Sequence, residues 1–326
     1  MIFFRRLILI ATFLAFGVVV LGAYVRLSDA GLGCPDWPGC YGHISPHHAA
    51  GSIAAAEAIQ PGGPVSQPKA WKEMIHRYLA GTLALLILAI AVTAWLKRRE
   101  IYHGWALPSL LLLVVVFQAL LGMWTVTELL KPLVVTGHLV GGMTTLALLT
   151  WLWLRESRAG DISYVPQAPW LRPWAIVGLA LLAGQIMLGG WVSTNYAALA
   201  CQDFPTCHGA WIPSMDFLHA FTLQRPLGMD AQGALLSQEA LTAIHWTHRL
   251  GALIVFVYLG WLGSKVLKTQ GFKSMGAVML GLLTLQVILG ISNVLASLPL
   301  PIAVAHNAVA ALLLVTLITL NFKLKA

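Results

Sequence analysis

Residues 71–96 read WKEMIHRYLAGTLALLILAIAVTAWL, a stretch in which His76 stands near the start of a long apolar run. A helix needs roughly 20 mostly apolar residues to cross the hydrocarbon core of a bilayer. Hydrophobic residues make up 58% of the 326-residue chain and charged residues only 10%, which excludes an ordinary soluble globular protein. We expect an all-α integral membrane protein with eight spans, near 6–27, 71–96, 105–127, 132–154, 172–194, 241–264, 274–296 and 301–322.

Basic residues predict how the chain lies in the membrane. Of the 20 Lys and Arg residues, 13 fall on one side of the predicted spans. The positive-inside rule makes that side cytoplasmic and places the N- and C-termini there. The formal net charge of +8 is therefore a topology signal. No basic cluster lies in a soluble segment, so the expected partner is the lipid bilayer and we expect no nucleic acid.

The chain is an internal duplication. Cys34-Pro-Asp-Trp-Pro-Gly-Cys40 matches Cys201-Gln-Asp-Phe-Pro-Thr-Cys207 at an offset of 167 residues. Each unit contains four spans, so both copies enter the membrane in the same direction, which predicts parallel repeats. We expect two four-helix bundles, over 1–160 and 161–326, each with a cofactor between facing helices.

The first span resembles a signal peptide, because Arg5 and Arg6 precede an apolar run. Its end, residues 21–25 (LGAYV), matches residues 188–192 (LGGWV) of the fifth span, so we expect it to be part of the fold. The N-terminus has no Arg- and Ser-rich transit sequence. A bacterial plasma membrane is favoured over an organelle.

Four histidines occupy equivalent places in alternate spans: His76 and His138 in the first unit, His248 and His306 in the second. Ionisable groups at that depth are rare and usually functional, although a lone histidine is more often a polar contact between helices. The residue one turn deeper is small each time, which leaves room for a flat macrocycle. Two facing neutral imidazoles are suitable axial ligands for haem iron. The pattern predicts two bis-histidine haem sites, both toward the outer face.

The residues around these histidines distinguish the two units. Arg77 and Arg249 follow His76 and His248, and we expect them to pair with haem propionates, the alternative being arginines that reach lipid headgroups. Glu73 stands three residues before His76, where the second unit has His245. A carboxylate there can transfer protons. Alternatively, Glu73 is an acid in the first turn of a helix, where its interaction with the helix dipole is worth only about 0.3–1 kcal/mol. Its exchange for glutamine should then leave folding near normal.

Two further patterns repeat. The cysteines lie in outer loops, where disulfides persist, so we expect the bridges Cys34–Cys40 and Cys201–Cys207, as loop staples or as redox groups. A Leu-Gly pair recurs in the odd-numbered spans, with a glutamine one turn earlier in three of them. Close helix approach with an interhelical hydrogen bond is the favoured interpretation, and a haem-pocket lining is the alternative. The residues concerned are Gly22, Gly122, Gly189 and Gly290, and Gln118, Gln185 and Gln286.

Taken together, these features resemble the haem A synthase family over nearly the whole chain. The resemblance rests on residues 73–77 (EMIHR), the four histidines, the two cysteine pairs and the duplicated spans. It implies an oxidoreductase that converts the C8 methyl group of haem O, through hydroxylated intermediates, to the formyl group of haem A for terminal oxidase assembly. It also implies that His248 and His306 hold a resident haem b, while His76, His138 and Glu73 bind and act on the substrate.

The same resemblance implies a transient encounter with haem O synthase, and an electron donor that the sequence does not identify. The sequence leaves open whether the chain forms a homo-oligomer. The competing function is a di-haem b cytochrome that passes electrons between quinol and a periplasmic partner. This function explains the paired histidines equally well, but it assigns no role to Glu73.

Overall fold

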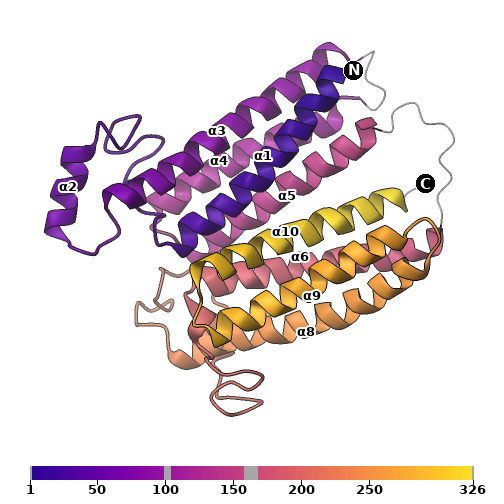
Figure 1. Cartoon of the computed structure of the whole chain (residues 1–326). Coiled ribbons are helices and arrows are strands. Elements are labelled where there is room, and N and C mark those ends of the chain that lie inside the picture. The colour runs from indigo at the N-terminus through magenta and orange to yellow at the C-terminus, as the bar shows by residue number, and fades with distance from the viewer. Residues whose placement is uncertain (1, 99–103, 158–167, 325–326) are drawn as a thin grey trace.

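The computed structural model describes residues 2–98, 104–157 and 168–324, and these form an almost entirely helical molecule (Figure 1). No strand lies within these ranges, where only isolated bridges such as Cys40 with His43 occur. Eight helices are long and apolar enough to cross a membrane. Their bounds are α1 Ile2–Leu27, α3 Gln67–Leu96, α4 Ala106–Thr127, α5 Pro132–Ser157, α6 Arg172–Thr194, α8 Gln238–Lys268, α9 Lys273–Leu295 and α10 Leu300–Lys323. The predicted spans and the all-α class are confirmed.

Short helices interrupt the loops between these spans. They are α2 Ala50–Ile59, the 3-10 turns η1 Pro169–Leu171 and η2 Ala197–Leu199, and α7 Phe217–Ala220. Both long loops end in a serine that caps the next helix. Ser66 accepts a hydrogen bond from Lys69 N at the start of α3, and Ser237 accepts one from Ala240 N at the start of α8.

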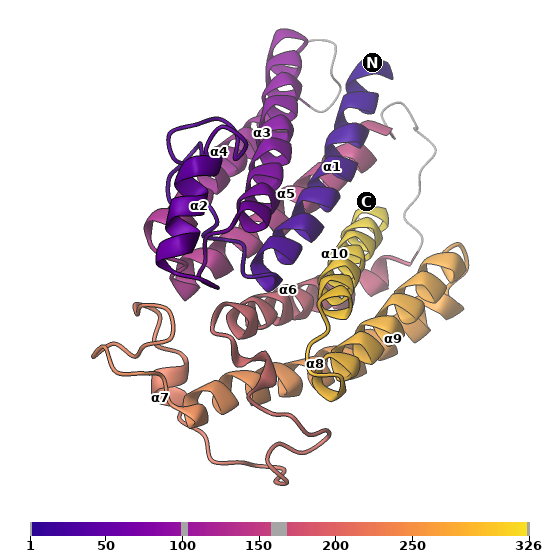
Figure 2. The same cartoon turned by 60° about the vertical axis from the view of Figure 1, so that its left-hand side comes forward.

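The spans form two groups of four. In the first, α1 contacts α3, α3 contacts α4, α4 contacts α5, and α5 returns to α1. In the second, α6, α8, α9 and α10 close the same ring of contacts. The groups meet where α1 and α5 contact α10 and where α5 contacts α6 (Figure 2).

Two contacts at this junction join residues that the duplication makes equivalent. Arg26 Nη2 donates to the carbonyl oxygen of Ser193 at 2.6 Å, and the Tyr196 hydroxyl donates to Asp29 Oδ1 at 2.9 Å. Both pairs are 167 residues apart, the offset that relates the two cysteine motifs. These contacts join the C-terminal end of α1 to the C-terminal end of α6.

The outer surface of the spans is apolar. Phe13 of α1, Leu85 of α3 and Leu113 of α4 are 66–70% exposed. A soluble protein rarely leaves so much contiguous apolar surface in water. This surface is therefore suited to contact with lipid tails.

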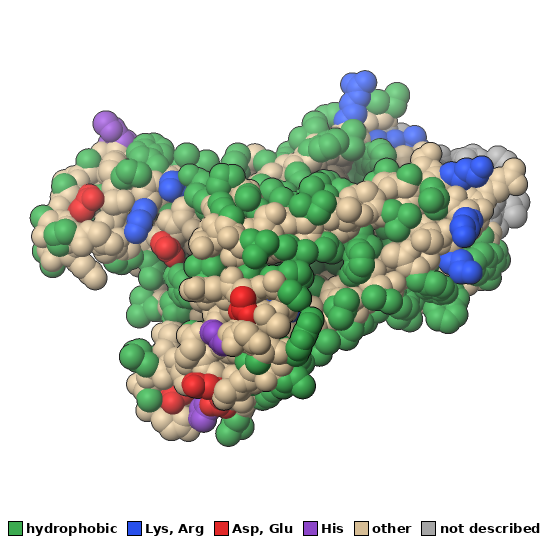
Figure 3. Space-filling view, turned by 60° about the horizontal axis from the view of Figure 1, so that its bottom comes forward, with side chains coloured by type: hydrophobic (Ala, Val, Ile, Leu, Met, Phe, Trp, Pro, Cys, Tyr) green, Lys and Arg blue, Asp and Glu red, His purple; other side chains and the backbone are tan. Residues whose placement is uncertain are grey.

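Charge separates the two ends of the bundle. Lys and Arg side chains gather at one end, and Asp, Glu and His side chains gather over the long loops at the other (Figure 3). The described chain begins and ends at the same end of the molecule (Figure 1). The end with residues 28–66 and 195–237 is called the loop end below.

Candidate functional site

The four bundle histidines lie in the first three turns of their helices, toward the loop end. His76 is on α3 and His138 on α5, in the first group; His248 is on α8 and His306 on α10, in the second. His76 lies within electrostatic range of His138, and His248 within electrostatic range of His306. The structure therefore brings the predicted residues together in the predicted pairs.

Each imidazole is seated against a glycine of a neighbouring helix. A Cβ atom placed on Gly22 of α1 would lie 3.0 Å from His76 Cε1. The other three sites repeat this contact. The distance from the added Cβ to the histidine Cε1 would be 3.3 Å for Gly122 and His138, 3.2 Å for Gly189 and His248, and 3.1 Å for Gly290 and His306. These contacts agree with the favoured interpretation of the Leu-Gly repeat, close helix approach with an interhelical hydrogen bond from the glutamine. These glycines make room for histidine rings.

Three of the four rings have an Nδ1 atom without a hydrogen-bond partner among the described residues. These rings are His76, His138 and His306, and in each of them the Nδ1 atom is buried. An unpaired buried polar atom is costly, and native structures rarely keep one without a reason. The two imidazoles of each group of helices could bind one iron between them.

Glu73 is buried beneath the first disulfide loop. Its side chain is 5% exposed, Oε1 lies 2.5 Å from Arg77 Nη2, and Oε2 accepts the Cys34 N–H at 2.9 Å. Cys34 thus lies above Glu73, as loop order suggested. The contacts with Arg77 and Cys34 are worth more than a helix-dipole interaction, since a hydrogen bond between charged groups contributes about 1.5–3 kcal/mol. That Glu73→Gln leaves folding near normal stays a prediction.

The second half repeats this arrangement with a different chemical group. His245 Nδ1 faces Cys201 N at 3.3 Å, and Arg249 Nε donates to His245 Nε2 at 3.2 Å. An imidazole therefore occupies the place of the Glu73 carboxylate. The frame is the same in both halves, and an acid is present only in the first.

Arg77 and Arg249 hold the two disulfide loops. Arg77 Nη1 donates to the carbonyl oxygen of Asp36 at 2.8 Å, and Arg249 Nη2 donates to that of Cys201 at 2.9 Å. These contacts, and not headgroup contacts, occupy much of each guanidinium. Pairing with propionates stays a prediction.

The disulfides are formed as predicted, Cys34 with Cys40 and Cys201 with Cys207. Each loop is closed a second time by an aspartate. Asp203 accepts the N–H groups of His208 at 2.7 Å and Gly209 at 3.0 Å, and Asp36 accepts those of Tyr41 and Gly42 in the same way. The Thr206 hydroxyl, with these N–H groups, holds the pKa of Asp203 well below its usual range. Both loops are rigid covers above the histidines.

Sequence reasoning missed a buried arginine in the second long loop. Arg225 is 3% exposed; it donates to Asn195 Oδ1 and, at 3.0 Å, to the carbonyl oxygen of Met229. Its guanidinium lies 5.7 Å from the centre of the Trp191 ring. The matched cysteine and histidine motifs give no counterpart to Arg225 in the first half, so the duplication provided no signal for it.

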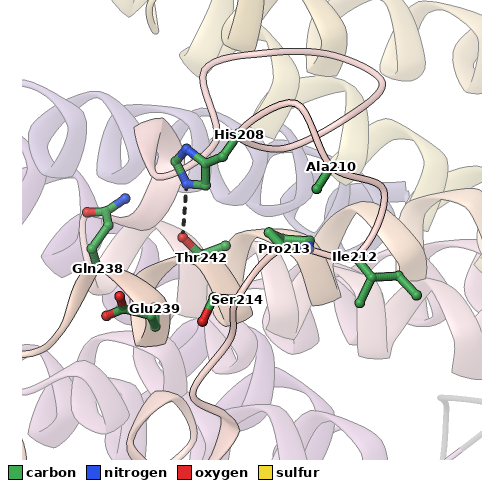
Figure 4. Close-up of a pocket in the computed structure, with 8 residues that line it drawn as sticks. All are labelled: His208, Ala210, Ile212, Pro213, Ser214, Gln238, Glu239 and Thr242. Atoms are coloured by element: carbon green, nitrogen blue, oxygen red, sulfur yellow. Dashed lines mark hydrogen bonds between the residues drawn. The ribbon is translucent and has the colours of Figure 1, made fainter.

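A pocket at the loop end lies outside the histidine sites. It is lined by residues of the second long loop and the start of α8, and His208 Nε2 lies 3.3 Å from Thr242 Oγ1 across it (Figure 4). None of the four bundle histidines lines it. We assign it no part in the chemistry.

Comparison with known proteins assigns the family. The family model described as cytochrome oxidase assembly protein, COX15-CtaA, matches residues 5–318. A haem A synthase of Shewanella oneidensis is 44% identical over 317 residues, which cover 97% of this chain and 94% of that protein. A haem A synthase of a Caulobacter strain is 28% identical and covers 96% of this chain and 93% of its own length. This chain therefore belongs to the COX15-CtaA family of cytochrome oxidase assembly proteins.

Proposed function

We propose that this chain is a haem A synthase, which oxidises the C8 methyl group of haem O to the formyl group of haem A for terminal oxidase assembly. The observation that carries this proposal is the exchange of Glu73 for His245 between two otherwise matching sites. A protein that only passes electrons needs no carboxylate in one half. An enzyme with one reacting site and one resident cofactor needs the halves to differ.

The residues present fit a haem in each half. Each pair offers two imidazoles, each seated against a glycine, and in three of the four rings the buried Nδ1 has no partner among the described residues. We assign the resident haem b to His248 and His306, where no acid stands beside the ligands. When bound, this haem supplies one-electron redox chemistry.

The first half would hold the substrate. His76 and His138 bind the iron of haem O and fix the depth of its ring. Glu73 lies one turn from His76 and can accept the proton released as the methyl carbon is oxidised, because a carboxylate within reach is a suitable base. Arg77 holds that carboxylate and the loop above it, and its remaining donors are available to a propionate.

The proposed setting is the plasma membrane of a bacterium, with both termini cytoplasmic and both haem sites toward the outer face. The charge separation between the ends supports this orientation. The contacts between residues 167 apart support parallel repeats about an axis along the membrane normal. The haem O would come from haem O synthase in a transient encounter.

A direct test uses a host that makes haem O but no haem A. Expression of this chain there should produce haem A, detected by chromatography of extracted pigments. A host whose pigments are unchanged, although the protein is present in its membranes, would exclude the synthase function.

A glycine substitution tests the seats of the histidine rings. A Cβ in Gly189→Ala would meet His248 Cε1 at 3.2 Å, so the ring must shift. Overpacking typically costs about 1–3 kcal/mol, and we expect about tenfold or greater loss of affinity for haem b, measured by titration of the purified protein. Gly184→Ala in the same helix meets nothing within 4 Å and is the matched control. Equal haem b affinities of Gly189→Ala and Gly184→Ala would show that Gly189 does not position the His248 ring.

The cysteine pairs should differ in their effect on activity. Cys34 N donates to the proposed base, whereas Cys201 N faces His245. Serine substitution of Cys34 or Cys40 should therefore lower the yield of haem A more than substitution of Cys201 or Cys207, at equal protein levels. Equal losses from both pairs would show that the disulfides only staple the loops.

The di-haem cytochrome is the second candidate, because the two histidine sites match so closely in their seats and covers. It would bind haem b in both halves. The pigment content of the purified protein separates the two functions.

A further inference from the structure

The residue one turn before each seating glycine is not the same in the four sites. It is Gln118 in α4, Gln185 in α6 and Gln286 in α9, but Val18 in α1. Glycine and histidine repeat four times, whereas the glutamine repeats three times. The exception faces His76.

Gln185 contacts its histidine at two points. Its Nε2 lies 3.0 Å from His248 Nδ1 and 3.0 Å from the His248 carbonyl oxygen, and its Oε1 is buried without a partner. The amide therefore lies against the ring edge that does not bind iron. An imidazole that binds iron through Nε2 carries its proton on Nδ1 and must donate it. Turning the Gln185 amide over presents the unpartnered Oε1 as that acceptor, in exchange for the bond from Nε2 to the His248 carbonyl oxygen.

In the second site of the same half, a glutamine contacts the other ring nitrogen. Gln286 Nε2 lies 3.2 Å from His306 Nε2, so both ligands assigned to the resident haem touch a glutamine. In the first half, Gln118 Nε2 and His138 Nδ1 are both without hydrogen-bond partners among the described residues. Val18 can offer His76 no hydrogen bond.

A glycine makes room for the amide at two of the three glutamine sites. A Cβ on Gly251, three residues after His248, would lie 2.3 Å from Gln185 Oε1, so this glycine makes the room that the amide fills. Gly141, three residues after His138, does the same for Gln118. The corresponding residues are Val309 after His306 and Leu79 after His76. The site of His76 has neither the glutamine nor a glycine at this position.

We infer that Gln185 is a positioning residue that fixes His248 as a ligand of the permanently bound haem, and that Val18 leaves His76 unsupported so that the substrate haem can exchange. This inference rests on the proposed function. Partners that hold a ligating histidine typically change metal affinity by about 10–100-fold. A catalyst must release its product, whereas a resident cofactor must stay.

The test is transfer of haem from the purified holoprotein to an excess of apomyoglobin, followed by absorbance. Wild type should release haem in two phases, with haem b in the slow one. Gln185→Leu should accelerate the slow phase by about 10–100-fold and raise the reduction potential of haem b, because a ligand without an acceptor at Nδ1 is less basic. Gln185→Glu keeps an acceptor and should stay slow.

The reverse exchange is tested in the first half. Val18→Gln combined with Leu79→Gly should slow the fast phase by about tenfold or more, whereas Val18→Leu and Leu79→Gly alone should not. A slow phase of Gln185→Leu within twofold of wild type overturns the inference and leaves the proposed function intact. If Gln185→Leu binds no haem, a slow phase in Gln185→Glu supports the inference and an empty Gln185→Glu overturns it. Two haem b molecules released at one rate by wild type would instead overturn the proposed function.

Discussion

Glu73→Gln should accumulate haem O, or a partly oxidised haem, in a protein that still binds haem b. The amide can neither accept a proton nor stabilise positive charge on the methyl carbon, and loss of a general base typically costs about 10²–10⁴-fold in rate. The measurement is the ratio of haem A to haem O in extracted pigments, divided by the amount of protein that shows the haem b spectrum. This division removes the effect of instability, because the variant also weakens the buried contact between Glu73 and Arg77.

The chain provides its own control for this experiment. His245 occupies the equivalent place, with the same neighbours, the N–H of the first loop cysteine and the arginine one turn on. His245→Gln should disturb the second loop to a similar degree while leaving conversion of haem O within a few-fold of wild type. Wild-type turnover by Glu73→Gln would return the carboxylate to the structural task of holding the loop at Cys34 N.

Loss of the resident haem is the second large effect. His248→Ala or His306→Ala removes one of two axial ligands, and we expect the haem b absorption of the purified protein to disappear. His76→Ala and His138→Ala should keep that absorption, because their rings belong to the other group of helices. Glu73→Ala should keep it as well.

The comparison of these variants tests whether the second half holds the resident haem b and the first half the substrate haem. The measurement is the pyridine haemochrome content of each purified variant, at equal protein. If Glu73→Ala or His76→Ala abolished the haem b spectrum as completely as His248→Ala, the assignment of the resident haem to the second half would be wrong.

Much of this arrangement could be predicted from the sequence, because the membrane leaves few alternatives. Long apolar runs must be helices there, and a duplication places His76 and His248 at the same depth. The disulfides followed from two matching cysteine pairs in outer loops. The eight predicted spans agree with the observed helices to within a few residues.

Contacts that depend on side-chain direction could not be predicted in this way. The repeat identified the glycines, but only three-dimensional packing shows that Gly22 faces the His76 ring and not a helix backbone. The direction of Arg77, toward the Asp36 carbonyl, depends on a loop conformation that no periodicity specifies. Arg225 lies in a loop where the matched motifs provide no counterpart to compare.

The pigment content of the purified wild-type protein tests the central claim most directly, that two similar sites hold one resident haem and one substrate. Protein co-expressed with haem O synthase should be extracted with acidified organic solvent and its haems separated by chromatography. We predict haem b together with haem O, hydroxylated haem O or haem A. Haem b alone, at two per chain, would contradict the claim and identify a di-haem cytochrome.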